Sequence, residues 1–526
     1  MGQLIYGQLS QNAFGVDDVY VVVNPPQPVL VGGGNTNQGG LAGGAGWGPK
    51  NTPVTCGTPQ ELMQNFGTPI NSGFDLVQEG SLFLKQLPRG GVKAVRVVHA
   101  TTDAAASGTL LDTAPATGLT LTGKYTGSYG NTIQVFLGKG SNYQTGTKTW
   151  KVVIQPGVPN LPEVYDRISD GAGSGALWQN IADAINNGQA GYTQPSQYVT
   201  AAIAASALEA PTVGQTITLT GGLDGATGIT SADLIGVDGG AGARTGAYAL
   251  RETGVNAMWL CGNSDSTVWT TLQALAQSEK SIAFCSLPEG TGVATAVSAI
   301  LAAGLNSPWA VLLKDYVTYF DSFVGGNVQV PPASVAAGIM CRLAAHQSPG
   351  NNQAYALVGT EATLGTAPQP YSFDDLSALE QAGINLIAIP IPGARAFGLR
   401  HGKSTSTNPA TSEITYANMT NFLTSAFVSE VMGQFVNLNQ STRQDDPTRE
   451  SVTAAMNGFL GGLLANRQID DFSVQCDLNN NPPNSIAAGF LICTVIIKYL
   501  AVIDKFVINM TAGQTVVTNT GAQPAR

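Results

Sequence analysis

The chain has 526 residues and a mass of 54.2 kDa, which is too long for one hydrophobic core, so we expect several separate cores. Its net charge of −10 and the lack of any cluster of five or more Lys or Arg exclude a nucleic-acid binder, because that task needs a basic surface. Only 11% of the residues are charged, against about 25% in an average soluble domain. This favours a protein whose faces are covered by copies of itself over an ordinary β-rich extracellular protein.

The N-terminal 30 residues are predicted to form an extended arm. Five consecutive residues have strand composition, and Pro25, Pro26 and Pro28 prevent a helix after them. Those five residues are Val19, Tyr20, Val21, Val22 and Val23. Because a lone strand leaves its backbone groups unsatisfied, we expect this one to pair with another segment. The segment has no basic region followed by a long apolar run, so no membrane targeting is expected.

A glycine-saturated run at residues 39–67 follows a short strand at residues 29–31. We interpret the run as a strand, a tight turn that needs positive φ angles, and a helix start. It carries no acid, base or nucleophile at its turn, and it lacks a GxGxxG fingerprint. Helices at residues 59–66 and 74–87 and a strand at residues 92–99 are expected to complete this unit.

The middle of the chain changes character twice. Residues 108–238 contain short strands and glycine turns with one helix near residues 176–186, which predicts an inserted β-rich domain. Beyond it, strands alternate with helices in a βαβαβ series that predicts a parallel sheet. The strands are expected at residues 257–261, 281–285 and 309–313, and the helices at residues 267–277 and 294–303.

The C-terminal third is predicted to open with a helix at residues 373–382 and a strand at residues 384–389. Two long amphipathic helices follow, over residues 419–435 and 452–464, and Asp446-Pro447 is a start signal for the second. Three strand-like runs come next, at residues 472–477, 490–499 and 502–510. The polar tail holds one isolated strand candidate, composed of Thr515, Val516 and Val517.

These elements predict an α/β and α+β multidomain chain with a mixed sheet, helices, an inserted β-rich domain and extended arms at both ends. The predicted divisions are an N-terminal arm at residues 1–30, an α/β middle domain at 31–107 and 239–370, the insertion at 108–238, a C-terminal domain at 371–510 and a C-terminal arm at 511–526. The six cysteines lack CxxC spacing and lie mostly in apolar runs, so we expect reduced thiols and a cytoplasmic folding compartment.

We find no motif for catalysis, a cofactor or a metal. Residues 398–404 resemble a phosphate-binding loop but are one residue short, and Pro409 stands in the following segment, where that loop needs a helix. Asp477 begins a calcium-like spacing that lacks both the turn glycine and the closing carboxylate. The alternative is an enzyme that uses the βαβαβ region, for which Glu289 and Asp315 are the candidate residues.

Five motifs in order resemble those of the tail sheath proteins of contractile bacteriophages and related injection systems. The first is GGAGWGPKNTPV at residues 43–54 with Phe66-Gly67 after it. The other four are LTGGLDG at 219–225, VPPAS at 330–334 with Ala337-Gly338, GIN at 383–385 and FSVQCD at 472–477. One departure is Phe397-Gly398-Leu399-Arg400-His401, which keeps the Gly and Arg of the family's run but not its Trp and Thr.

The resemblance implies a non-enzymatic structural subunit without cofactors or metals. It implies stacked hexameric rings around a tube, with the tail tube, baseplate and tail terminator proteins as partners, and no nucleic acid or membrane insertion. Its expected location is the virion tail, after synthesis in the host bacterial cytoplasm, and the resemblance fits phages, headless tailocins and secretion devices alike. It also implies that arms add strands to neighbouring subunits. The candidate donated strands are Val19 to Val23 and Thr515 to Val517, and residues 490–499 and 502–510 are the candidate receiving sheet.

Overall fold

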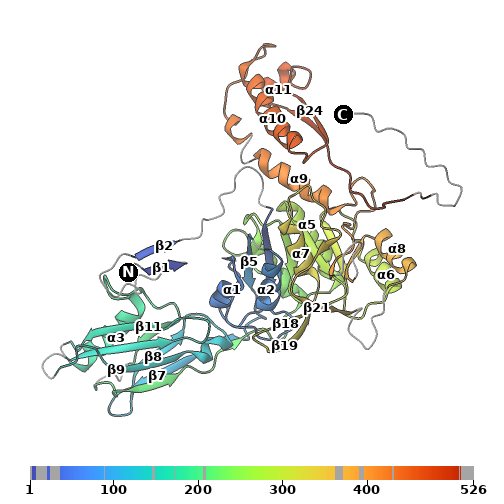
Figure 1. The fold of residues 1–526 in the computed structure, drawn as a ribbon. Helices are drawn as coiled ribbons and strands as arrows, with labels where there is room; N and C mark the ends of the chain where they lie inside the picture. Colours follow the sequence, from blue (N-terminus) through green and yellow to red (C-terminus); the bar gives the residue numbers. More distant parts are fainter. Residues whose placement is uncertain are drawn as a thin grey trace.

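The computed structural model describes residues 3–6, 20–23, 36–87, 89–144, 148–171, 173–204, 209–361, 371–389, 396–428, 432–508 and 510 (Figure 1). A central α/β unit carries a β-rich insertion on one side and a helical C-terminal part on the other. Among these residues, no helix is both long and apolar enough to cross a membrane.

The central unit is built on a nine-stranded mixed sheet. Its strand order is β20-β23-β22-β17-β16-β15-β3-β5-β4, and the strands from β22 to β5 run parallel. The bounds are β20 Asn352–Gln353, β23 Gly398–Leu399, β22 Ile384–Ala388, β17 Ala310–Lys314, β16 Ile282–Ser286, β15 Ala257–Leu260, β3 Gln38–Gly43, β5 Gly91–Arg96 and β4 Val54–Cys56. Every residue of β15, β16, β17 and β22 is buried, as is typical of parallel strands covered on both faces.

Helices cover both faces of this sheet. On one face lie α1 (Pro59–Phe66), α2 (Leu76–Gln86) and α7 (Ala333–Arg342), and on the other lie α5 (Trp269–Ser278), α6 (Val293–Ala303) and α8 (Phe373–Gln381). The predicted βαβαβ series is therefore confirmed, because β15, α5, β16, α6 and β17 follow in that order. Alternating short apolar runs and helical periods are a sufficient signal for this region.

The glycine run contains the expected strand, turn and helix start, but the glycines of its first part are not turn glycines. Residues 38–43 form β3, which lies in the middle of the sheet between β15 and β5. Its glycines serve close packing: a Cβ on Gly43 would meet Cys261 Sγ at 2.8 Å, and one on Gly40 would meet Leu250 at 3.0 Å. Positive φ is found further along, at Gly48 (96°) and at Gly67 (81°), which ends α1. The strand expected at residues 29–31 lies outside the described residues.

The insertion has its own core, as predicted for a β-rich unit. It contains β7 Ser107–Leu111, β8 Thr117–Gly123, β9 Gln134–Lys139, β10 Thr149–Gln155, β11 Glu163–Ser169, α3 Ser174–Asn187, β12 Val199–Ile203 and β13 Gln215–Thr218. These strands form the antiparallel sheets β11-β10-β9-β13 and β12-β8-β7, which pack with α3. Trp47, from the glycine run, lies in this core against Tyr125, so the run joins the central sheet to the insertion.

Smaller elements connect these units. They are β6 (Asp103–Ala104) with β14 (Leu223–Asp224), α4 (Ser231–Ile235), and the sheet of β18 (Val317–Asp321), β19 (Gly326–Val330) and β21 (Leu357–Thr360). Buried Arg96 donates hydrogen bonds to the carbonyl oxygens of Gly48 (2.8 Å), Thr126 (2.7 Å) and Asp224 (3.0 Å). One side chain thus ties the end of β5 to both sides of the insertion.

The C-terminal part consists of α9 (Ile414–Ala426), α10 (Pro447–Ala465), β24 (Asp471–Gln475), α11 (Pro483–Ala487) and β25 (Thr494–Lys498). The second predicted amphipathic helix is confirmed as α10, which begins at Pro447 after Asp446. The first is shorter than predicted, because α9 ends at Ala426 and a 3₁₀ turn occupies Gly433–Phe435. Periodicity alone overlooks Gly433, a residue that disfavours a continuous helix.

The predicted domain boundaries remain a proposal. The central sheet includes β22 and β23, which follow position 370 in the chain, as well as strands that precede it. The N-terminal segment contributes β1 (Gln3–Tyr6) and β2 (Tyr20–Val23), which pair with each other in parallel.

Candidate assembly interface

Strands β24 and β25 form a two-stranded antiparallel sheet that has no further strand among the described residues. Phe472 opposes Ile497, and Val474 opposes Val495. Exposure alternates along both strands, so these four half-buried side chains share the inner face. On the outer face Ile496 is 66% exposed. A two-stranded sheet is marginal by itself, so its stability depends on what its faces and edges contact.

The inner face rests on a small apolar cluster contributed by α9, α10 and the segments beside them. Its buried members are Ala345, Met419, Leu423, Leu460, Leu463 and Ile469. Phe427 and Phe459 pack edge to face at 5.8 Å next to it. The sheet is therefore held by one face only, while its outer face and outer edges are open in the described chain.

A groove of about 500 Å³ opens between β24 and the N-terminal half of α10. One wall consists of Val474, Gln475, Cys476 and Asp477, and the other of Arg449, Glu450, Thr453, Ala454 and Asn457, with Gln444 at the end. The lining combines backbone of a strand with short polar and apolar side chains. This combination suits an extended peptide that pairs with a strand.

Arg449 fixes the position of α10 beside this groove. It is 2% exposed, lies 3.3 Å from Asp446 Oδ2, and donates hydrogen bonds to the carbonyl oxygens of Ser441 (2.6 Å) and Arg443. Asp446 was predicted to cap α10, and it does precede the helix, but its side chain makes no capping hydrogen bond. Its carboxylate faces Arg449 instead.

The segment after β25 leaves the sheet and exposes large apolar side chains. Phe506 is 82% exposed, and the others are Ile503, Val507, Ile508 and Met510. Residues 502–510 were predicted to be a strand paired with residues 490–499, but the described residues there form no strand, and β25 pairs with β24. Strand composition is not sufficient where no neighbouring strand is available.

An ion cluster holds this segment against the central unit. Lys403 Nζ contacts Glu413 and lies 2.6 Å from Asp504 Oδ2. Burial opposes the charge on Lys403, but its bonds to Asp504 and Glu413 outweigh that effect and raise its pKa. The neighbouring His401 is buried near Arg400 and Lys403, which lowers its pKa to about 4, so the ring is neutral at pH 7. The run that resembled a phosphate-binding loop thus anchors the C-terminal segment.

The predicted donor strands are only partly within the described residues. Tyr20–Val23 form β2, whose parallel partner in the same chain is Gln3–Tyr6. Val19 and the candidates Thr515, Val516 and Val517 lie outside the described residues. The sequence predicts a strand at residues 472–477 but does not show that this strand pairs with β25. The alternation of apolar and polar residues in FSVQ is the signal for a strand with one buried face.

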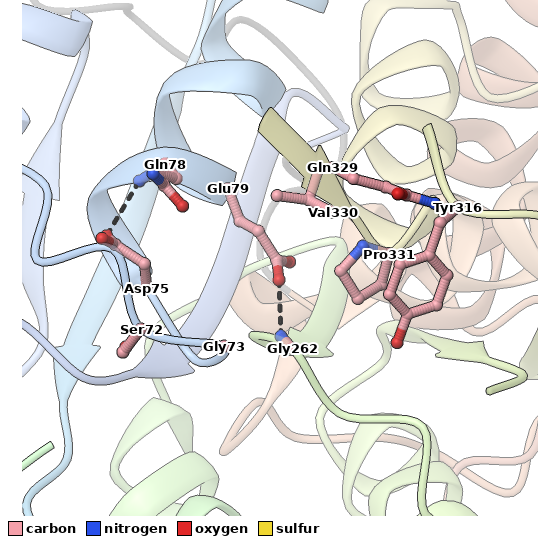
Figure 2. Close-up of a pocket in the computed structure, with 10 residues that line it drawn as sticks. All are labelled: Ser72, Gly73, Asp75, Gln78, Glu79, Gly262, Tyr316, Gln329, Val330 and Pro331. Carbon is pink, nitrogen blue, oxygen red and sulfur yellow. Dashed lines mark hydrogen bonds between the residues drawn. The ribbon is translucent and has the colours of Figure 1, made fainter. Parts of the chain in front are cut away.

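A second concave site bears on the alternative prediction of an enzyme. The pocket in Figure 2 measures about 170 Å³ and lies between α2, β19 and Gly262, which follows β15. This is the edge at which parallel strands end, and the sheet order changes direction between β3 and β15. Ligands of α/β proteins commonly bind at such a position.

The chain's own carboxylates fill the polar positions of this pocket. Asp75 accepts hydrogen bonds from the backbone amides of Ile70, Asn71, Val77 and Gln78, so the N-terminus of α2 is already capped. Glu79 accepts from the amide of Gly262 and from Trp259 Nε1 at 3.1 Å. Burial raises the pKa of Glu79 to about 8 and that of Asp75 to about 6. The arrangement does not fit a phosphate-bearing cofactor.

The two candidate catalytic carboxylates, Glu289 and Asp315, line neither of the two concave sites described above. Glu289 is exposed. Asp315 is 2% exposed and contacts Lys314 and the Tyr371 hydroxyl. The described residues contain no group of three metal-ligating side chains. Around Asp477, the amide oxygens of Asn480 and Asn481 accept backbone hydrogen bonds of the turn and of Ile492.

Comparison with known proteins points to one family. No family model matches the chain. A tail sheath protein of Burkholderia phage BcepMu is 27% identical over 288 residues, which are 51% of this chain and 58% of that protein, so less than two thirds of the relative is matched. Among solved structures, a sheath tail protein of Desulfitobacterium hafniense aligns with TM-score 0.56 and 13% identity over 90% of this chain and 99% of its own.

Two further structures share the fold. A sheath tail protein of Listeria innocua aligns with TM-score 0.57 and 14% identity over 89% of this chain and 96% of its own. The helical sheath of the anti-feeding prophage in its contracted state aligns with TM-score 0.51 and 10% identity over 95% and 99%. The sequence match and the fold matches agree with each other, because each of these proteins is described as a sheath protein.

Proposed function

We propose that the chain, which resembles tail sheath proteins in sequence and in fold, is a sheath subunit that polymerises as stacked hexameric rings around an inner tube and contracts to drive that tube through a target envelope. Its proposed partners are further copies of itself, the tail tube protein, and baseplate and tail terminator proteins. The sheath would be made in the host cytoplasm and reside in the tail of a phage or related injection system.

The proposal is carried by the two-stranded sheet β24–β25, which has open edges among the described residues and a peptide-sized groove beside β24. We place the donated strands of neighbouring subunits there, with Val19 to Val23 and Thr515 to Val517 as the donors. Added strands would satisfy the exposed backbone groups and extend a marginal sheet. Backbone pairing of this kind persists while the rigid bodies of the subunits rotate.

Contraction would draw its free energy from subunit contacts that form only in the compact state, starting from a metastable extended one. The carboxylates of the Figure 2 pocket serve the fold rather than a reaction, in keeping with this view. The ion cluster of Lys403, Glu413 and Asp504 holds the start of the C-terminal segment against the central unit. An enzymatic role has no comparable support.

Deletion of residues 1–24 tests the proposal. The deleted protein is expected to remain a folded subunit that forms no tubes in electron micrographs, because it lacks the donor strand. A control truncation after residue 519 keeps both candidate strands and should assemble. Tubes of normal length and regularity from the 1–24 deletion would refute strand donation by the N-terminal arm.

A further inference from the structure

Two cysteines oppose each other at the end of the β24–β25 sheet. The last paired residues in the register are Gln475 and Thr494, so Cys476 and Cys493 are the next opposing pair. Both fall on the inner face of the sheet, because they continue the alternation of Val474 and Val495. Directly opposed residues of antiparallel strands have Cα atoms about 4.5–5.5 Å apart, within the range that a disulfide spans.

The turn next to the pair holds the two cysteines in this register. Asn480 Nδ2 donates to the carbonyl oxygen of Gln475 at 2.7 Å and lies 3.3 Å from Thr494 Oγ1. Buried Asn481 exchanges two hydrogen bonds with the backbone of Ile492, at 2.8 and 2.6 Å. The residues on both sides of Cys493 are therefore tied to the strand and turn that carry Cys476.

The two thiols influence each other and differ from the remaining cysteines. Cys493 is among the groups that lower the pKa of Cys476, and Cys476 is among those that raise the pKa of Cys493. Cys476 is buried and Cys493 is half-buried, so one sulfur is within reach of a small reagent. Cys56, Cys261, Cys285 and Cys341 are buried in the cores on the two faces of the central sheet.

We propose that Cys476 and Cys493 are a disulfide-forming pair, which closes when the reduced protein meets a low-molecular-weight disulfide. The thiolate of Cys493 attacks the reagent, so that a mixed disulfide forms and one small thiol leaves. The thiolate of Cys476 then attacks Cys493 Sγ and expels the second small thiol. Two protons leave the protein thiols, the protein loses two electrons, and the reagent is reduced to two thiols.

Disulfide formation between Cys476 and Cys493 is slow at neutral pH. Burial raises the pKa of Cys476, and burial together with Cys476 raises the pKa of Cys493 to about 11. The reactive thiolate is therefore scarce at neutral pH, and its fraction rises about tenfold per pH unit below the pKa. The facing charged groups are Arg449, which favours the thiolate of Cys476, and Asp446 and Asp477, which oppose it.

Closing the bond would fix one wall of the groove. Cys476 lines the groove beside Gln475 and Asp477, so the disulfide would hold β25 against that wall. This inference concerns the subunit itself and does not depend on whether arms are exchanged. An oxidised subunit should therefore carry the bond with or without tube assembly.

The full-length protein, purified in reductant and then transferred to oxidised glutathione, provides the test. We expect the intact mass to fall by two hydrogens, a peptide map to link Cys476 with Cys493, and the rate to rise about tenfold per pH unit from about pH 7 to about pH 9. The Cys476→Ser variant should instead keep a stable glutathione adduct on Cys493. Wild-type protein that stays fully reduced, or that keeps the adduct on Cys493 without closing the bond, would overturn the proposal.

Discussion

Gly39 lies beneath the ring of Phe83, so closely that a Cβ on Gly39 would stand 2.6 Å from Phe83 Cζ. Trp259 covers the same position, with its Cζ3 at 2.8 Å, and the Phe83 and Trp259 rings lie 5.0 Å apart. The side chains of Phe83 and Trp259 in the central core therefore pack directly against the backbone of Gly39 in β3.

Substitution of Gly39 by Ala should therefore destabilise the subunit. The added methyl group must displace two buried rings, and overpacking of this kind costs about 1–3 kcal/mol. Urea unfolding of the isolated subunit, followed by tryptophan fluorescence, measures the change. A midpoint equal to that of the wild type would show that the rings move aside freely.

The same substitution at Gly458 should have the opposite sign. Gly458 lies inside α10, where an added Cβ would meet no atom of the described residues within 4 Å beyond its chain neighbours and the helix's own backbone. Ala is favoured over Gly in a helix interior by about 0.5–1 kcal/mol. The pair of variants separates close packing from backbone entropy, since only Gly39→Ala should lower the urea midpoint.

The buried carboxyl group of Glu79 should make the stability of the folded subunit depend on pH. Its pKa rises from 4.5 in the unfolded chain to about 8 in the fold, so the folded state binds the extra proton between these values and stability falls as pH rises through them. Asp75 contributes in the same direction only up to about pH 6. His401, whose pKa is lowered to about 4, opposes this trend up to about pH 7, so the decline between about pH 7 and pH 8 belongs mainly to Glu79.

The Glu79→Gln variant checks this assignment. Gln places an NH₂ group against Trp259 Nε1 or the amide of Gly262, so the variant should be less stable at low pH. Its urea midpoint should nevertheless be flat between about pH 7 and pH 8. A wild-type slope that persists in the variant would assign the titration to another group.

The Arg449→Ala substitution should destabilise the packing of α10 beside the groove. It leaves the carboxylate of Asp446 buried without its partner, a loss of about 3–5 kcal/mol for a buried pair. Arg443→Ala is the matched control, because Arg443 is 77% exposed and an exposed ion pair contributes about 0–1 kcal/mol. Thermal unfolding of the two variants should differ clearly, and equal losses would contradict the role given to Arg449.

Asp504→Asn should loosen the C-terminal segment with little effect on global stability. Asp504 is 41% exposed, so its ion pair with Lys403 is partly screened. We expect faster amide exchange and faster proteolysis of residues 499–510 while the midpoint of unfolding stays unchanged. Asp470→Asn, which removes the exposed pair with Lys498, should leave the cleavage rate of that segment as it is.

Sequence reasoning succeeds where a local pattern and the tertiary structure demand the same residues. Short apolar runs such as Ile282–Ser286 between helical segments are typical of buried strands. Asp446-Pro447 starts α10 because the φ angle and missing amide of proline suit a first turn. The family resemblance rests on glycine motifs whose order is fixed by the fold, so it does not depend on the role assigned to each glycine.

The errors concern features that depend on distant residues. The role of Gly39 is decided by Phe83 and Trp259, neither of which is near it in sequence. Residues 502–508 have strand composition, but Asp504 is drawn to Lys403, about a hundred residues earlier, and no strand lies beside them in the described chain. The receiving partner of β25 is likewise set by the packing of β24 on α10 rather than by proximity in sequence.

The place of β3 in the sheet also constrains how the chain is made. Asn256, just before β15, binds the carbonyl oxygen of Thr36, 220 residues earlier, so the insertion must be synthesised before β3 gains that neighbour. At a translation rate of about 5–20 residues per second, the time between the synthesis of Thr36 and that of Asn256 is roughly 10–40 s. A strand of Gln, Gly, Leu and Ala is a weak template for aggregation during this interval, because it is rich in Gly and lacks β-branched and aromatic residues. The glycines that make room for aromatic rings in the finished subunit thus also protect the nascent one.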